Sequence, residues 1–453
     1  MADSYIGLPN DGSGKRLATK ENNGLHKQVF TIGDADNNYT QSVDKYGAAT
    51  VTFQGGGFDF DSFGKAKVSE ETVLSSFIPE FDEEPTKFRV ETEGTSELVY
   101  VPNEKSVKLK VDTTEGDRVV RTSHRYHKYI AGVSNTTIMT VNPSESKDGV
   151  VKRWGLFDDN NGIFFEIDGH DGYLVIRSNV SGTPVDKRIG WADWNGDKMD
   201  GQGLSGITMG FAKSNIYWID FQWLGVGMVQ WGIMHPNGTK ILIHTEENAN
   251  KYSTVYMGSA NLPIRHEIFN KAGTASASEM RIHNSVVLMN EANPAFEGKR
   301  FVAGKGMNDD KIHITNDWKI LIIARQKDEF KGKPNHSAAM LKSINLYCNK
   351  PMVLSIQRGT TTEDDEHYGN IDPESTVEIA ADATLKTHGV RLHNRLIPAG
   401  IHTIDIVDEF DYLSECLQQG PKELSYSILA RTVDKDDEDD IMVGLQWEEL
   451  RMA

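Results

Sequence analysis

The sequence predicts an all-β protein in which an extended N-terminal arm precedes two antiparallel β-sandwich domains of jelly-roll or concanavalin-like type. Its 453 residues exceed what one hydrophobic core usually organises. Short segments with the period-two alternation of half-buried strands follow one another from about residue 61, and only one segment has helical spacing. We therefore expect an arm over 1–60, a first sandwich over 61–300 and a second over 301–453.

The first 60 residues are polar, rich in Asn, Asp and Gly, and have no helical period. Such a segment has too little apolar surface to form a core alone. We expect it to attach the protein to a partner that orders it.

Two hairpins follow directly from turn chemistry. GIFFEID (162–168) and GYLVIRS (172–178) flank Gly169-His170-Asp171, and MVQWGIM (228–234) and TKILIH (239–244) flank His235-Pro236-Asn237-Gly238. Gly supplies positive φ, and Asn-Gly is among the strongest hairpin signals. Both pairs should be antiparallel neighbours.

The remaining predicted strands carry β-branched or aromatic residues in alternation. They span 106–112, 117–126, 284–289, 318–326, 343–348, 351–359, 375–381 and 441–450. One short helix is predicted near 405–419, where Ile406, Phe410, Leu413 and Leu417 fall on one stripe. The polar stretch 290–317 is the predicted boundary between the sandwiches.

Charge and cysteine usage narrow the function classes. A net charge of -18 repels nucleic acid and anionic membranes, so neither is an expected partner. Cys348 and Cys416 form no metal or disulfide pattern, and free buried thiols are expected. The N-terminus lacks a signal-peptide pattern, and no apolar run approaches the roughly 18 residues of a membrane span, so we expect synthesis and folding in a cytosol.

The loop NGDKMDGQGLSG (195–206) carries two overlapping motifs. Asp193, Asn195 and Asp197 alternate as in a calcium loop, but Lys198 and Leu204 occupy the positions where an EF-hand needs Gly and a bidentate Glu. A looser calcium site using Asp193, Asp197 and Asp200 stays open as a weak candidate. We predict no other metal site and no cofactor.

The GxGxxG spacing of Gly201, Gly203 and Gly206 would suit a dinucleotide site only between a buried strand and a helix. Here polar residues precede the glycines and strand-like alternation follows them. We interpret the glycines as turn formers and the aspartates as turn caps.

Other candidate chemistry is sparse. GxSxG and HExxH are absent, and no acid/base pair can be named, so we predict no catalytic residues and no enzymatic activity. His388 and His393 are interpreted as surface or hydrogen-bonded histidines rather than metal ligands. Tyr217, Trp218, Trp223 and Trp231 are interpreted as core, with a glycan-facing role for Trp218, Trp223 and Trp231 as the alternative.

Six blocks in order give the chain a family resemblance. The blocks span 61–69 (DSFGKAKVS), 153–169, 175–182, 193–206, 219–232 and 256–268. Together they resemble a group of tailed-bacteriophage virion structural proteins with relatives in large algal viruses. Two departures from the family pattern stand out. Members commonly carry a DSFGRLRVS-like block where this chain has DSFGKAKVS, and many carry a cysteine-containing segment where this chain has RIHNSVVLM (281–289).

The resemblance implies a structural component of a virion on the tail, baseplate, fibre or head surface. No catalytic residue carries over from it. The expected partners are other virion proteins and further copies of the chain in a closed homo-oligomer, a trimer being one form. Three alternatives stay open: a capsid-surface decoration or head-fibre protein, a module that binds host-surface glycans, and, ranked lowest, a glycan hydrolase or lyase.

Overall fold

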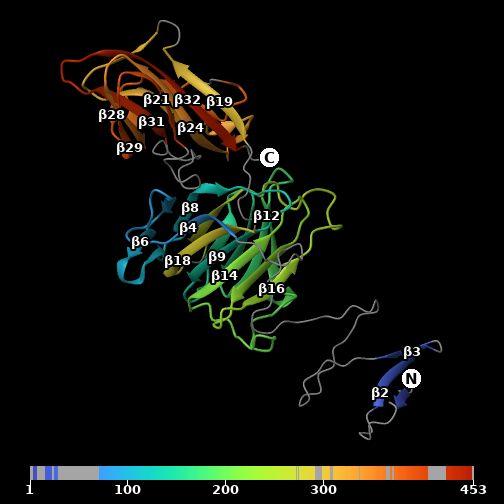
Figure 1. Cartoon of the computed structure of the whole chain (residues 1–453). Helices are drawn as coiled ribbons and strands as arrows, with labels where there is room; N and C mark the ends of the chain where they lie inside the picture. Colours follow the sequence, from blue (N-terminus) through green and yellow to red (C-terminus); the bar gives the residue numbers. More distant parts are fainter. Residues whose placement is uncertain are drawn as a thin grey trace. The chain divides into compact units, whose positions relative to one another are not determined.

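The computed structural model describes residues 4–7, 16–22, 25–28, 71–290 without 272 and 274, and 298–450 without 307–309, 336, 364–367, 370–371 and 407–424. Its contacts group 1–59 as one unit and 60–453 as another. Regular helix in the described residues is limited to two short 3-10 turns, η1 (Pro102–Glu104) and η2 (Trp191–Asp193). The all-β, antiparallel prediction is confirmed (Figure 1).

Most of the predicted arm lies outside the described residues. Its described part is a three-stranded antiparallel sheet of β1 (Ser4–Gly7), β2 (Arg16–Asn22) and β3 (Leu25–Gln28). The helix predicted near 405–419 also lies outside them, apart from its first two residues.

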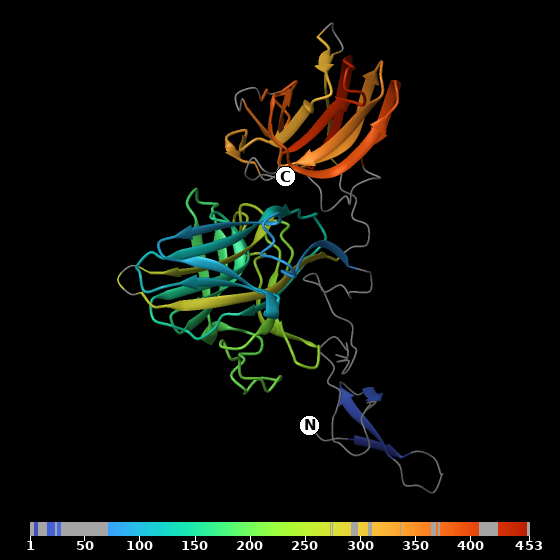
Figure 2. The ribbon, with the colours of Figure 1, turned by 90° about the vertical axis from the view of Figure 1, so that its left-hand side faces the viewer.

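Residues 72–289 form two antiparallel sheets (Figures 1 and 2). The seven-stranded sheet has the order β13 (Val185–Gly190), β12 (Asp171–Ser178), β11 (Gly162–Asp168), β10 (Val150–Phe157), β17 (Leu262–Asn270), β8 (Arg118–His127), β5 (Phe88–Glu93). The eight-stranded sheet has the order β16 (Lys240–Glu246), β15 (Val229–Met234), β14 (Asn215–Phe221), β9 (Asn135–Asn142), β18 (Ser278–Met289), β7 (Ser106–Val111), β6 (Glu97–Val101), with β4 (Thr72–Phe77) beside β18.

Alternating side chains place the first core between these sheets. On β7, Val107, Leu109 and Val111 are buried in the core, because residues two apart point to the same face of a strand. The Trp154 ring of β10 meets the Tyr217 ring of β14 edge-on, with 4.9 Å between centroids. The two sheets therefore form a β-sandwich.

Both predicted hairpins are confirmed. β11 pairs with β12, and β15 pairs with β16. The first turn is one residue shorter than predicted, because Asp171 already pairs with Asp168 as the first residue of β12. Gly169 and Gly238 have φ of 62° and 88°, which explains the glycine at each turn.

Residues 299–450 form a second sandwich. One sheet has the order β19 (Lys299–Lys305), β32 (Asp439–Leu450), β24 (Ala338–Cys348), β30 (Gly400–Asp405), with β20 (Ile312–Ile314) beside β32. The other has the order β27 (Val377–Ala381), β21 (Lys319–Gln326), β31 (Tyr426–Thr432), β25 (Met352–Arg358), β29 (Val390–Ile397). Two small ribbons pair β22 (Glu329–Phe330) with β23 (Lys333–Pro334) and β26 (Thr361–Thr362) with β28 (Leu385–Thr387).

A separate core fills the second sandwich. Ile344 of β24 and Ile428 of β31 belong to one buried cluster, so the two sheets share it. Cys348 is a buried free thiol of this core, as expected, whereas Cys416 lies outside the described residues. β19 and β20 lie within the polar stretch 290–317, which is therefore partly strand. The domain boundaries themselves stay a prediction.

Candidate functional site

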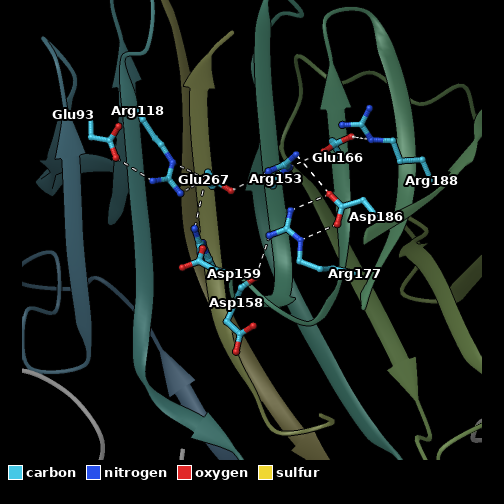
Figure 3. Close-up of polar contacts among 11 residues, drawn as sticks. Glu93, Arg118, Arg153, Asp158, Asp159, Glu166, Arg177, Asp186, Arg188 and Glu267 are labelled. Carbon is cyan, nitrogen blue, oxygen red and sulfur yellow. Dashed lines mark hydrogen bonds and ion pairs between the residues drawn. The ribbon is translucent and has the colours of Figure 1, made fainter. Parts of the chain in front are cut away.

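The most organised group of charged residues lies on the outer face of the seven-stranded sheet. The inner face of β11 supplies Ile163, Phe165 and Ile167 to the core. The intervening residues Phe164 and Glu166 therefore lie on the opposite face. Neighbouring strands repeat this division, so the outer face collects arginines, carboxylates and a few aromatic rings. We call this group the arginine–carboxylate network (Figure 3).

Strand register sets the centre of the network. Arg153 of β10 pairs with Glu166 on β11 and with Glu267 on β17. Its Nε donates to Glu166 Oε2 at 2.6 Å, and its Nη1 donates to Glu267 Oε2 at 3.4 Å. One guanidinium thus lies between two carboxylates of adjacent strands, as Figure 3 shows.

Glu267 is the most heavily paired carboxylate. Arg118 lies 2.7 Å from it through Nη2, and Arg265 lies 3.5 Å from it, both at Oε1. Its side chain is only 3% exposed. Burial alone would raise the pKa of Glu267, but Arg265, Arg153 and Arg118 together hold that pKa below its ordinary value. Glu267 is therefore ionised at neutral pH.

A second part of the network connects β12 and the edge strand β13. Arg177 binds Asp186 in a bidentate pair, with Nε and Nη2 at 2.8 and 2.9 Å from the two carboxylate oxygens. Arg188 lies 2.8 Å from Glu166. Burial would raise the pKa of Asp186, but the hydrogen bonds and charge of Arg177 lower it overall. This carboxylate is also held in its ionised form.

Two buried phenylalanines form the floor beneath the guanidinium groups. The rings of Phe157 and Phe164 lie 4.4 Å apart and are fully buried. The guanidinium carbons of Arg177 and Arg265 lie 5.2 Å from the Phe164 and Phe157 centroids respectively. Gly155 permits this packing, because a Cβ there would lie 2.6 Å from the Phe164 Cα. Each guanidinium is thus fixed by a ring below and by carboxylates beside it.

This arrangement does not suit general acid catalysis. A glycosidase acid needs a carboxyl group whose pKa is raised, so that it carries a proton at working pH. Here the pKa values of Glu267, Asp186 and Asp159 are all lowered, because arginines outweigh the effect of burial. Asp159 and Glu93 are the more exposed carboxylates of the network, with 76% and 60% of their side chains accessible. The face therefore offers solvent charged groups rather than a protonated carboxyl group at Glu267, Asp186 or Asp159.

Sequence reasoning did not identify this network. Its signal is present, since Arg265 and Glu267 alternate with buried residues on β17 as Glu166 does on β11. Choosing these carboxylates among 66 acidic residues, however, needs the order of the strands, which the sequence pattern does not give.

The weak calcium candidates do not converge. Asp197 accepts hydrogen bonds from the amides of Met199 and Ser205, each at 2.8 Å, and Asp200 accepts one from Gln202 at 2.9 Å. Asp193 is exposed at the end of η2. No group of three or more His, Cys, Asp or Glu side chains that could hold a metal ion occurs among the described residues.

The glycine-rich loop has the turn role that the sequence predicts. Gly201 and Gly206 have φ of 81° and 65°, and Asp197 caps the loop amides. The loop runs back along β16, where the amides of Gly196 and Asp197 donate to the carbonyls of Ile243 and Leu242. A strand, β14, follows the loop, which excludes the strand–loop–helix context of a dinucleotide site.

Two of the three candidate glycan-facing tryptophans, Trp218 and Trp231, are buried, so that alternative is wrong for them. Trp231 is fully buried between the sheets. Trp218 is 4% exposed, because its ring packs against Gly232, where a Cβ would meet it at 2.3 Å. Trp223 is half-buried, and its Nε1 donates to the Met257 carbonyl at 2.9 Å. Trp231 therefore belongs to the core, whereas Trp218 is buried on the opposite face of β14.

Comparisons with known proteins give distant similarities of shape. No protein-family model matches the chain, and no curated protein matches it in sequence.

Among the described residues, no helix is long and apolar enough to cross a membrane.

Three solved structures represent the similarities. A legume lectin-like domain from Entamoeba histolytica has 10% identity and a TM-score of 0.30, covering 48% of this chain and 98% of its own. A glycoside hydrolase family protein from Mycobacterium thermorestibile has 12% identity and a TM-score of 0.32, covering 48% and 100%. The CBM2 module of an evolved Dit of Lactobacillus casei BL23 phage J-1 has 7% identity and a TM-score of 0.30, covering 49% and 98%. At these scores the similarities do not distinguish lectin, hydrolase and virion roles.

Proposed function

We propose that the protein is a non-enzymatic structural component of a bacteriophage virion, associated with the tail, baseplate or fibre. In this role residues 1–60 attach to neighbouring subunits, and the two β-sandwiches are displayed for host attachment. The proposal rests on the ordered sequence blocks within 61–268 and on one structural observation, the arginine–carboxylate network.

The network supports a structural role because its buried carboxylates form ion pairs with arginines. Glu166 and Glu267, the two most deeply buried carboxylates of the face, each contact at least two arginines. We infer that these buried ion pairs hold the sheet in one defined geometry. A fixed geometry is what a repeated part of a particle requires.

A hydrolase role receives no comparable support. The arginines lower the pKa values of Glu267 and Asp186, so neither carboxyl group is suited to donate a proton to a leaving group at neutral pH. The glycan-binding alternative also loses two of its three proposed aromatic residues, because Trp218 and Trp231 are buried.

Particle incorporation tests the proposal. Particles that lack this protein are supplied with the full chain, with residues 61–453, or with a full chain carrying Glu93→Gln as a control at an exposed carboxylate. We expect the full chain and the control to be incorporated equally, and the truncated chain to stay folded but outside the particle. Equal incorporation of residues 61–453 would refute the attachment role of the arm.

Reconstruction of the particle distinguishes the remaining alternative. Density for the sandwiches on the capsid would replace the tail assignment with a decoration or head-fibre role. Absence of the two sandwiches from purified particles would overturn the virion proposal.

A further inference from the structure

The second sandwich carries a cationic group that no function described above uses. It lies on the outer face of the sheet formed by β27, β21, β31, β25 and β29, opposite the core. The core side of β25 and β31 contributes Leu354, Ile356 and Ile428. Arg431 of β31 and Arg391 of β29 belong to the other face, since Arg431 pairs with Val353 and Arg391 pairs with Gln357.

Both arginines converge on one indole ring. The guanidinium carbons of Arg431 and Arg391 lie 5.2 and 5.8 Å from the ring centroid of Trp318, the residue just before β21. His388, in the turn between β28 and β29, meets the same ring edge-on at 6.1 Å. The third and fifth strands of the sheet, β31 and β29, thus supply arginines to one ring that precedes the second strand, β21, and we call Trp318, Arg391, Arg431 and His388 the Trp318 cluster.

The turn that carries His388 is fixed in place. Gln357 is fully buried, and its Oε1 accepts a hydrogen bond from the Gly389 amide at 3.1 Å and lies 3.2 Å from His388 Nδ1. A Cβ on Gly389 would lie 2.2 Å from the Arg358 carbonyl oxygen, so the close approach of the turn requires glycine. His388 is a hydrogen-bonded histidine, as the sequence predicts, and it is held beside Trp318.

Among the residues that the structure describes, the two guanidinium groups have no anionic partner. Neither Arg391 nor Arg431 makes a side-chain hydrogen bond or ion pair within the part of the chain that the structure describes, and Nε of Arg431 is buried without an acceptor. Other described arginines have carboxylate partners, as Arg325 has Glu378 at 2.5 Å and Arg281 has Glu279 at 2.7 Å. In a chain of net charge -18, two unpaired arginines at one ring are a notable exception.

Stacking on a ring leaves a guanidinium able to bind an anion. A guanidinium carries five N–H donors, and a contact with an aromatic ring satisfies none of them as a hydrogen-bond acceptor would. Such donors fit a carboxylate, sulfate or phosphate in bidentate geometry. The Trp318 cluster therefore brings two guanidinium groups with unused donors to one ring.

The surroundings of the cluster select a saccharide as the carrier of that anion. Asn394, which is exposed, and Leu396, which is 64% exposed, share this face of β29. Amide, imidazole and apolar groups beside the arginines suit the hydroxyl groups and C–H faces of a sugar. An extended polyanion such as nucleic acid is disfavoured, because the net charge of the protein repels it.

We propose that Trp318, Arg391, Arg431 and His388 form a binding site for a saccharide that bears a carboxylate, sulfate or phosphate group. The site does not depend on the arm or on assembly, so its failure would leave the proposed virion role intact.

Isothermal titration of the full chain tests the proposal. The probes are an oligogalacturonate, a sulfated oligosaccharide, a neutral oligosaccharide of equal length, inorganic phosphate, and a glutamate-rich peptide. The variants are Arg391→Gln and Arg431→Gln. The matched control is Arg300→Gln, which removes the same charge from an 82% exposed side chain of the same sandwich.

At least one charged oligosaccharide should bind, and the neutral one should bind at least about tenfold more weakly. Each cluster variant should weaken the charged probe about 10- to 100-fold, whereas Arg300→Gln should stay within about twofold. Three results would overturn the proposal: no binding of either charged oligosaccharide, binding that both cluster variants leave unchanged, or peptide or phosphate binding as tight as that of the saccharide. Far-ultraviolet circular dichroism of each variant separates loss of binding from loss of fold.

Discussion

Replacing Glu267 by Gln should destabilise the first sandwich more than any exposed charge change. The carboxylate is 3% exposed and contacts three guanidinium groups, of which Arg265 is 4%, Arg153 12% and Arg118 28% exposed. Removing one partner of a buried pair costs about 3–5 kcal/mol, because the remaining charges stay buried without compensation. Arg118 keeps Glu93 as a partner at 3.1 Å and is partly solvated, so we expect the lower figure, about 3 kcal/mol.

Urea denaturation followed by tryptophan fluorescence measures this effect. Six of the eight tryptophans lie in the first sandwich, at positions 154, 191, 194, 218, 223 and 231, so the signal reports mainly on that part of the chain. With an m value of about 3 kcal/mol per M, the midpoint should fall by about 1 M. Glu93→Gln, at a 60% exposed carboxylate, should shift it by less than about 0.3 M. Equal shifts for the two variants would refute the argument that the network is energetically coupled.

Three further predictions concern pH, the buried tryptophans and calcium. Burial lowers the pKa of His127 to about 3 and the pKa of His266 well below its ordinary value. Below pH 6.5 the unfolded chain therefore binds more protons than the folded chain, so the free energy of unfolding should fall by up to about 2.7 kcal/mol for each pH unit of acidification in thermal or urea scans. In His127→Gln this slope should be about half as steep. Trp231→Ala and Trp218→Ala should each lower the free energy of unfolding by about 3–5 kcal/mol in the same urea assay, because both rings are buried. A variant that keeps its stability but loses glycan binding would show instead that the ring contacts a glycan. Neither a chelator nor millimolar calcium should change the melting temperature. Asp197→Ala should lower stability by about 1 kcal/mol, because the carboxylate no longer accepts hydrogen bonds from two backbone amides. A rise in melting temperature with calcium that Asp197→Ala abolishes would restore the metal hypothesis.

Local patterns predicted much of the fold. The hairpins around Gly169 and Gly238 follow from turn chemistry, which acts over a few residues and is therefore visible in the sequence. Alternation located strands such as β7 and β21 to within a residue or two of their ends.

The same reasoning could not find the charged sites, because they depend on long-range pairing. Arg153 and Glu267 are 114 residues apart, and only the placement of β17 beside β10 brings them together. Trp318 and Arg431 likewise meet through the pairing of β21 with β31. The aromatic alternative at Trp218 was wrong for a related reason, since only the neighbouring strand supplies the glycine on which that ring rests.

The edge strand β13 illustrates what the network adds to folding fidelity. VDKRIG has one buried apolar side chain, Ile189, so hydrophobic alternation alone specifies its alignment weakly. Two ion pairs also specify the register of this strand, because Asp186 must face Arg177 and Arg188 must face Glu166. A slip of one residue would turn both charges toward the core. Misaligned copies of this edge should therefore be rejected as the strand docks, which protects an exposed sheet margin from pairing with the wrong chain.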